Sequence, residues 1–105
     1  MSNLRPTLRT TKEPGLSYEA TYFRVLQATS DCRGLIHGKL ENAAGQACAI
    51  GVYFKQTNVP IDSAAIDEIA AYNDSFPKLS RHERWLKVRQ WLRFKTCGFE
   101  RRATP

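Results

Sequence analysis

The stretch from Gly45 to Asp74 restricts the possible folds of this chain more than any other part of the sequence. It begins with G-Q-A-C-A-I-G-V-Y-F, where small residues let another backbone approach closely and bulky residues supply a core. After Pro60 it continues as I-D-S-A-A-I-D-E-I-A-A-Y-N-D, whose spacing predicts an amphipathic helix that ends in a turn at Asn73 and Asp74. The stretch therefore predicts a buried centre against which the rest of the chain packs.

Local signals predict helices around this centre. Ser17 is suited to cap a helix, because its side-chain oxygen can accept a bond from a free amide of the first turn. The expected apolar face of that helix comprises Tyr18, Tyr22, Val25 and Leu26. Residues 48–56 are expected to be helical, since the run is too long and too rich in alanine and glycine for an edge strand. Asp62 is the expected N-cap of the helix that follows.

The last predicted helix runs from Arg81 to about Lys95. Ser80 and Glu83 have the spacing of a capping box at its start. Gly98 is expected to end it, because glycine readily adopts the left-handed conformation of a helix cap. The inner face of this helix is expected to contain Trp85, Val88 and Leu92.

Residues 33–49 predict a small β-hairpin. Residues 35–40 alternate in the way that strands do, and Asn42 to Gly45 is suited to a turn with glycine at a positive φ. The predicted fold class is therefore α+β: about four helices, with one two-stranded hairpin packed on them. An all-α fold is the alternative if residues 33–49 form no strands.

The length of 105 residues suits a single compact domain, which is expected to span residues 17–105. Residues 1–16 contain two prolines and no apolar period, so they are interpreted as a flexible N-terminal arm. The longest apolar runs are far shorter than the roughly 20 residues of a membrane helix, and the N-terminus has no signal-peptide pattern. A cytoplasmic location, in a host cell, is the expectation.

The positive charge is concentrated in the last third of the chain. Residues 1–74 contain seven Lys/Arg and eight Asp/Glu, whereas residues 75–105 contain nine and two, which accounts for the net charge of +6. Such asymmetry favours an acidic partner, either nucleic acid or protein. The basic residues expected to bind it are Arg81, Arg84, Lys87, Arg89, Arg93, Lys95, Arg101 and Arg102.

The sequence contains no constellation that indicates catalysis or a cofactor. Cys32, His37, Cys48 and His82 are candidate zinc ligands, but their spacing matches no standard site. An odd number of cysteines without C-x-x-C spacing also argues against a disulfide framework. Cys48 lies in the most apolar run, which is unsuitable for an activated thiolate. We therefore expect a protein without enzymatic activity, metal or cofactor.

Several short motifs together resemble a known protein family. They are Gly34-Leu35, Gly45, Cys48-Ala49-Ile50-Gly51, Asn73-Asp74 and the capped helix from Ser80. Across about residues 22–93 the chain resembles a family of small uncharacterised proteins that are frequent in phages and prophages. It departs from them at Ala49, where many relatives have a second cysteine, and in its more basic last helix with two tryptophans.

The resemblance implies a helical fold with a small β-ribbon and an origin in a mobile element. It also implies a structural role for the motif residues Gly34, Cys48, Gly51, Asn73 and Asp74. The family has no established activity, so the resemblance identifies no reaction for this chain.

Two functions are compatible with these features. The first is binding to a host protein or nucleoprotein complex, for example as an inhibitor of a defence complex such as CRISPR, because arginine and tryptophan often dominate the binding energy of interfaces. The alternative is direct nucleic-acid binding, in which the helix 81–95 contacts phosphates and a tryptophan stacks on a base. The helical spacing of Trp85 and Trp91 with Val88 and Leu92 favours a core position for both tryptophans, which would leave only the phosphate contacts.

Overall fold

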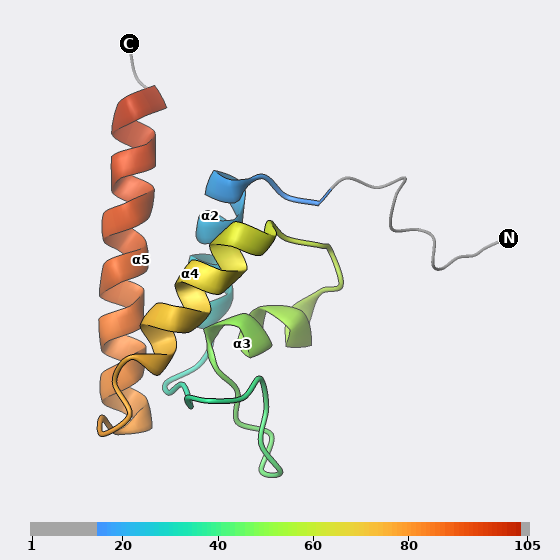
Figure 1. Ribbon diagram of the computed structural model, residues 1–105, viewed down its shortest axis with the longest axis vertical. Coiled ribbons are helices and arrows are strands. Elements are labelled where there is room, and N and C mark those ends of the chain that lie inside the picture. The colour runs from blue at the N-terminus through green and yellow to red at the C-terminus, as the bar shows by residue number, and fades with distance from the viewer. Residues whose placement is uncertain (1–14, 104–105) are drawn as a thin grey trace, which may run out of the picture.

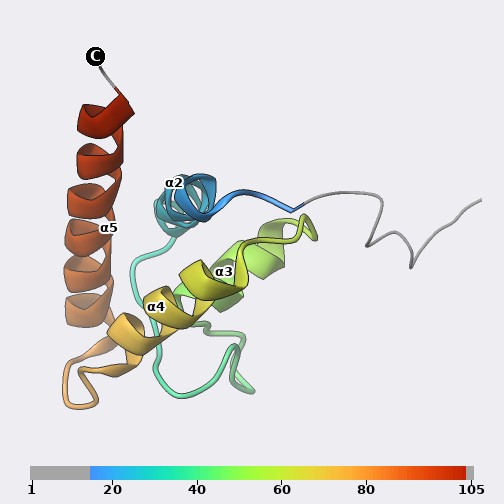
Figure 2. The same ribbon diagram turned by 45° about the horizontal axis from the view of Figure 1, so that its top comes forward.

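The computed structural model describes residues 15–103, and these residues form helices without any β-strand. The helices are α2 (Tyr18–Thr29), α3 (Ala49–Gln56), α4 (Ser63–Asp74) and α5 (Arg81–Ala103). Helix α5 lies along one side of the molecule, and α2, α3 and α4 are grouped beside it (Figure 1). After rotation, the C-terminal end of α5 still extends beyond the other helices (Figure 2). The mainly helical prediction is confirmed in its all-α form.

The predicted caps of α2 and α4 are present, and α3 has a cap that was not predicted. Ser17 Oγ accepts a hydrogen bond from Ala20 N at the start of α2, and Asp62 accepts one from Ala65 N at the start of α4. Helix α3 begins after Cys48, whose Sγ accepts a bond from Gly51 N. These bonds satisfy amides that have no partner within the helix, so each helix begins where its capping residue stands.

Helix α5 begins as predicted but ends later. Ser80 and Glu83 bond reciprocally, Ser80 N to Glu83 Oε1 and Glu83 N to Ser80 Oγ, both at 3.1 Å. The prediction that Gly98 ends the helix is wrong, since α5 continues to Ala103. The physical reason is Phe99, which is buried and packs edge-on against Tyr18 and Tyr22 of α2. This contact stabilises the helical turn that contains Gly98.

The core lies where α5 meets the other helices. Tyr22, Val25, Val88 and Leu92 are fully buried at the α2–α5 contact. Trp91 stacks on Tyr72 of α4, with ring centroids 4.3 Å apart. Pairs of this kind contribute about 0.5–1.5 kcal/mol beyond simple burial. The contacts of α5 with α2 and with α4 therefore both include aromatic side chains, which help to fix the position of α5.

The predicted hairpin at residues 33–49 is wrong. Within the described chain this segment contains one isolated antiparallel bridge, between Glu41 and Ala47, and no strand. The turn itself is present: Asn42 Oδ1 accepts bonds from the backbone amides at 44 and 46, and Gly45 has a φ of 83°. Three backbone bonds join the two arms of the segment, from Ile36 N to Ala47 O, from Asn42 N to Gln46 O and from Cys48 N to Leu40 O. No strand extends from them, because side chains of α4 and the backbone of α5 bond to other backbone groups of the segment in place of a ladder.

Asn73 and Asp74 at the end of α4 make most of these replacement bonds. Asn73 is fully buried; its Nδ2 donates to the Ile36 carbonyl at 2.8 Å, and its Oδ1 accepts from Ala49 N at 3.3 Å. Asp74 Oδ1 accepts from Gly38 N at 2.9 Å. The irregular segment is thus attached to α3 and α4 through two adjacent side chains.

Close contacts explain two glycines of the motif set, with backbone at Gly51 and with a side chain at Gly34. A Cβ on Gly51 would lie 2.1 Å from the Leu40 carbonyl oxygen, so α3 and the irregular segment touch at this point. A Cβ on Gly34 would lie 3.0 Å from Arg81 Cβ at the start of α5. Gly51 lies with Cys48, Asn73 and Asp74 at the junction of α3, α4 and the segment before α3, whereas Gly34 lies against the start of α5.

Among residues 15–103, no helix combines the length and the apolar character needed to cross a membrane. The N-terminal arm proposed for residues 1–16 lies mostly outside the described residues, and Leu16 donates its backbone N–H to the Pro60 carbonyl.

Candidate binding surface on helix α5

Arg84 was expected to contact a partner, but the structure buries it. Its guanidinium donates to the carbonyl of Leu35 at 2.8 Å and, through Nη2, to the carbonyls of Phe76 and Leu79 at 2.6 and 3.1 Å. Its Nε is buried and has no hydrogen-bond partner in the part of the chain that the structure describes. Arg84 therefore holds the α4–α5 loop and the irregular segment together, and it presents no charge at the surface.

Arg89 is held against α2 by its own hydrogen bonds. Its Nη1 donates to the Leu26 carbonyl at 2.8 Å and to Thr29 Oγ1 at 2.9 Å. Its guanidinium lies 5.6 Å from the centre of the Trp85 ring, and that of Arg33 lies 5.5 Å from the same ring. Partial burial lowers the pKa of Arg89, and the nearby charges of Arg93 and Arg33 lower it further. The guanidiniums of Arg33 and Arg89 thus both lie at the Trp85 ring, on the α2–α5 boundary.

Neither tryptophan is free to stack on a base. Trp85 donates its Nε1–H to the Thr29 carbonyl at 2.8 Å, and its ring also stacks with His82. Trp91 is stacked on Tyr72 and meets Tyr22 edge-on. Both rings contribute to the packing of α5, as their helical spacing indicated.

Three other cations of α5 are engaged by the protein itself. Lys87 Nζ lies 5.2 Å from the centre of the Phe76 ring. Lys95 Nζ lies over the rings of Tyr22 and Trp91. Arg102 pairs with Glu19 at 3.2 Å and lies over Phe99. These interactions are exposed or partly exposed, so they reduce the availability of the charges without removing it.

The outward face of α5, formed by Leu86, Gln90, Phe94 and Cys97, is exposed. Phe94 is 74% exposed and Leu86 is 50% exposed, which is unusual for large apolar side chains on the same helix face. A shallow hollow of about 540 Å³ lies beside Phe94. Its basic lining residues are Arg93, Lys95, Arg101 and Arg102. An exposed aromatic ring surrounded by cations is a composition typical of protein interfaces.

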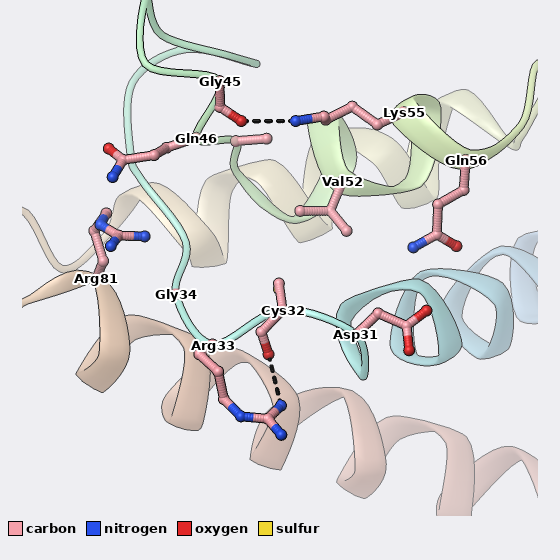
Figure 3. A pocket seen from close by; sticks show the side chains of 11 residues that line it. Asp31, Cys32, Arg33, Gly34, Gly45, Gln46, Val52, Lys55, Gln56 and Arg81 are labelled. Carbon is pink, nitrogen blue, oxygen red and sulfur yellow. Dashed lines mark hydrogen bonds between the residues drawn. The ribbon is translucent and has the colours of Figure 1, made fainter.

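A second hollow, of about 420 Å³, lies between α3, the start of α5 and residues 31–34 (Figure 3). It brings Arg33, Lys55 and Arg81 into one neighbourhood. Lys55 Nζ donates to the Gly45 carbonyl at 2.7 Å and pairs with Glu41, while Arg33 Nη1 donates to the Cys32 carbonyl (Figure 3). Two of its three cations are therefore occupied by internal bonds, and the hollow gathers no reactive set of side chains.

The candidate zinc ligands do not come together. Cys48 is buried as the cap of α3, and burial raises the pKa of its thiol. His82 Nδ1 donates to the Arg33 carbonyl at 3.1 Å on the outside of α5. Among residues 15–103 there is no group of three or more histidine, cysteine or acidic side chains that could hold a metal ion.

Two features of the surface were not anticipated from the sequence. Arg33 comes from the loop after α2 and joins the cations of α5, which only the tertiary fold can show. The exposure of Phe94 had a sequence signal, because Phe94 is two residues from Leu92 and therefore falls on the opposite side of the helix. No protein-family model, curated protein or solved structure matches this chain.

Proposed function

We propose that this chain is a small accessory protein of the phage type that binds a host macromolecular complex through the outward face of α5. The observation that supports the proposal is the exposed Phe94 ring with Arg93, Lys95 and Arg101 around its hollow. Complete burial of such a ring against a partner is worth about 1.5–3 kcal/mol. No catalytic group is needed for a protein that acts by occupying a surface.

The chemistry of this face defines the partner. The expected partner is a protein whose surface has an apolar pocket for Phe94 and carboxylates close to the cations around that ring. A nucleoprotein defence complex is one kind of host assembly that offers such surfaces close to a nucleic-acid channel. Binding there blocks the complex without any chemical step.

The test is a comparison of matched variants in a pull-down from nuclease-treated host lysate. Phe94→Ser removes the exposed ring, and Leu40→Ser is its control, because Leu40 is 56% exposed but lies in the segment before α3. Partners captured by the wild-type chain and by Leu40→Ser, but not by Phe94→Ser, are then purified and titrated directly. A loss of affinity of about tenfold or more for Phe94→Ser is expected.

Capture that is equal for all three proteins, or no capture from several hosts, would overturn the proposal. Both variants replace exposed side chains, so their free energies of unfolding should lie within about 0.5 kcal/mol of the wild type. Urea unfolding of each variant therefore separates a lost interface from a lost fold.

A further inference from the structure

A row of basic residues follows α5 beside the Phe94 ring and shares Arg93 and Arg101 with the hollow there. A spacing of four residues places side chains along one ridge of a helix. On α5 this ridge contains Arg89, Arg93, Cys97 and Arg101. Neighbouring positions of such a ridge are about 6 Å apart along the axis. Arg33 joins the row at Arg89, since both guanidiniums lie over Trp85. We call Arg33, Arg89, Arg93 and Arg101 the arginine row.

The charge of the arginine row is not balanced by salt bridges within residues 15–103. The ion pairs there join Lys55 to Glu41 and Arg102 to Glu19, and no member of the row takes part. Arg33 and Arg89 use Nη1 for their bonds to backbone carbonyls, which fixes their orientation and leaves further donors on each fork. Like charges repeated along one ridge favour binding of a ligand that carries several negative charges.

We propose that the arginine row binds the phosphate backbone of a single nucleic-acid strand, with one guanidinium to each contacted phosphate. A strand carries regularly repeated charges, which matches cations repeated along a helix ridge, and the guanidinium fork bonds phosphate oxygens in pairs. Because Trp85 and Trp91 are engaged inside the protein, the site has no tryptophan for base stacking and is insensitive to sequence. This site shares Arg93 and Arg101 with the proposed protein-binding face, but it extends to Arg33 and Arg89 and does not use Phe94.

Cys97 occupies the one uncharged step of the ridge and provides a gain-of-function test. Its side chain is exposed, so Cys97→Arg adds a cation between Arg93 and Arg101 without disturbing the core. The measurement is the fluorescence anisotropy of a labelled 12-nucleotide oligothymidylate, titrated with the full chain at low salt. Cys97→Arg is expected to tighten binding several-fold.

Charge reversal in the arginine row provides the complementary test, a loss of oligonucleotide affinity. Arg93→Glu and Arg101→Glu are each expected to weaken binding on the order of tenfold and to make the slope of log K against log salt shallower by about 0.7. Lys87→Glu is the matched control, because it makes the same charge change on α5 beside Phe76, away from the row. Glu100 adds a carboxylate next to Arg101 in the chain, so Glu100→Gln is expected to tighten binding.

Three outcomes would overturn the inference. They are the absence of oligonucleotide binding at low salt, an equal loss for Lys87→Glu and Arg93→Glu, and equally tight binding of an oligoglutamate of similar charge. Phe94→Ser separates the two proposals, since it is expected to abolish capture of the protein partner while leaving oligonucleotide affinity unchanged. Circular dichroism of each variant checks that α5 is retained.

Discussion

A methyl group at position 51 has no room in this fold. The Cβ of Gly51→Ala would lie 2.1 Å from the Leu40 carbonyl oxygen, 2.9 Å from the carbonyl carbon and 3.0 Å from Ala47 Cβ. The obstacle is backbone, so it cannot rotate away, and the same carbonyl accepts a hydrogen bond from Cys48 N at 3.1 Å. Moving it strains the attachment of the irregular segment to α3.

The magnitude follows from three effects. Overpacking costs about 1–3 kcal/mol, and the clash with backbone places this substitution at the upper end. Weakening the bond from Cys48 N adds about 1 kcal/mol, whereas the higher helix propensity of alanine restores up to about 1 kcal/mol. We expect Gly51→Ala to lower the free energy of unfolding by about 3 kcal/mol, a large part of the roughly 5–15 kcal/mol of a small domain.

Urea unfolding followed by tryptophan fluorescence measures this loss, because Trp85 and Trp91 both lie at the contacts of α5. Gly98→Ala is the matched control: it makes the same substitution inside a helix, and apart from the helix's own adjacent backbone no atom lies within 4 Å of the new Cβ. It is expected to stabilise the protein by about 0.5–1 kcal/mol. Equal effects at the two positions would refute the argument from steric contact.

Three further predictions follow from the buried and titrating groups. Arg84→Met leaves the carbonyls of Leu35, Phe76 and Leu79 without their donor and should cost about 3 kcal/mol in urea unfolding, with oligonucleotide affinity unchanged in the folded fraction. Hydrogen bonds from Tyr18 and Tyr22 lower the pKa of Glu68. Because this pKa is lower in the folded than in the unfolded protein, the ionised Glu68 stabilises the fold above about pH 4.3, and this contribution is lost as the pH falls through the folded pKa. Glu68→Gln should remove that part of the acid dependence of the free energy of unfolding. Maleimide labelling with mass spectrometry should modify Cys97 in the native protein and Cys48 only on unfolding; early labelling of Cys48 would contradict its buried position.

The helix starts could be predicted because their causes are local. Ser17, Asp62 and the Ser80–Glu83 pair each bond to amides within three residues, so the sequence contains the complete interaction. The hairpin failed for the opposite reason. Many of the bonds that hold the irregular segment come from residues more than thirty positions along the chain, namely Asn73, Asp74 and Arg84, and no local period indicates them.

The candidate site shows the same contrast between local and long-range interactions within one helix. Arg84 and Arg93 are both arginines of α5, yet one is buried and the other is exposed. Arg84 precedes Val88 and Leu92 at spacings of four, so its position on the inner face was visible in the sequence. What could not be seen were the three carbonyls, from two irregular segments, that make burial of its charge favourable.

Charge count alone therefore overstates the surface that a partner meets. Of the cations expected to bind, Arg84 is buried, and four others lie over aromatic rings of the same chain, namely Lys87, Arg89, Lys95 and Arg102. Around Phe94 the cations that remain are Arg93 and Arg101, and both also lie on the ridge that begins at Arg89. An undirected basic surface would bind any polyanion with an affinity set by total charge, whereas cations at fixed positions on one ridge make affinity depend on which charge is changed. Variants of equal net charge, such as Lys87→Glu and Arg93→Glu, must then differ, and that difference is what separates a built site from a merely basic protein.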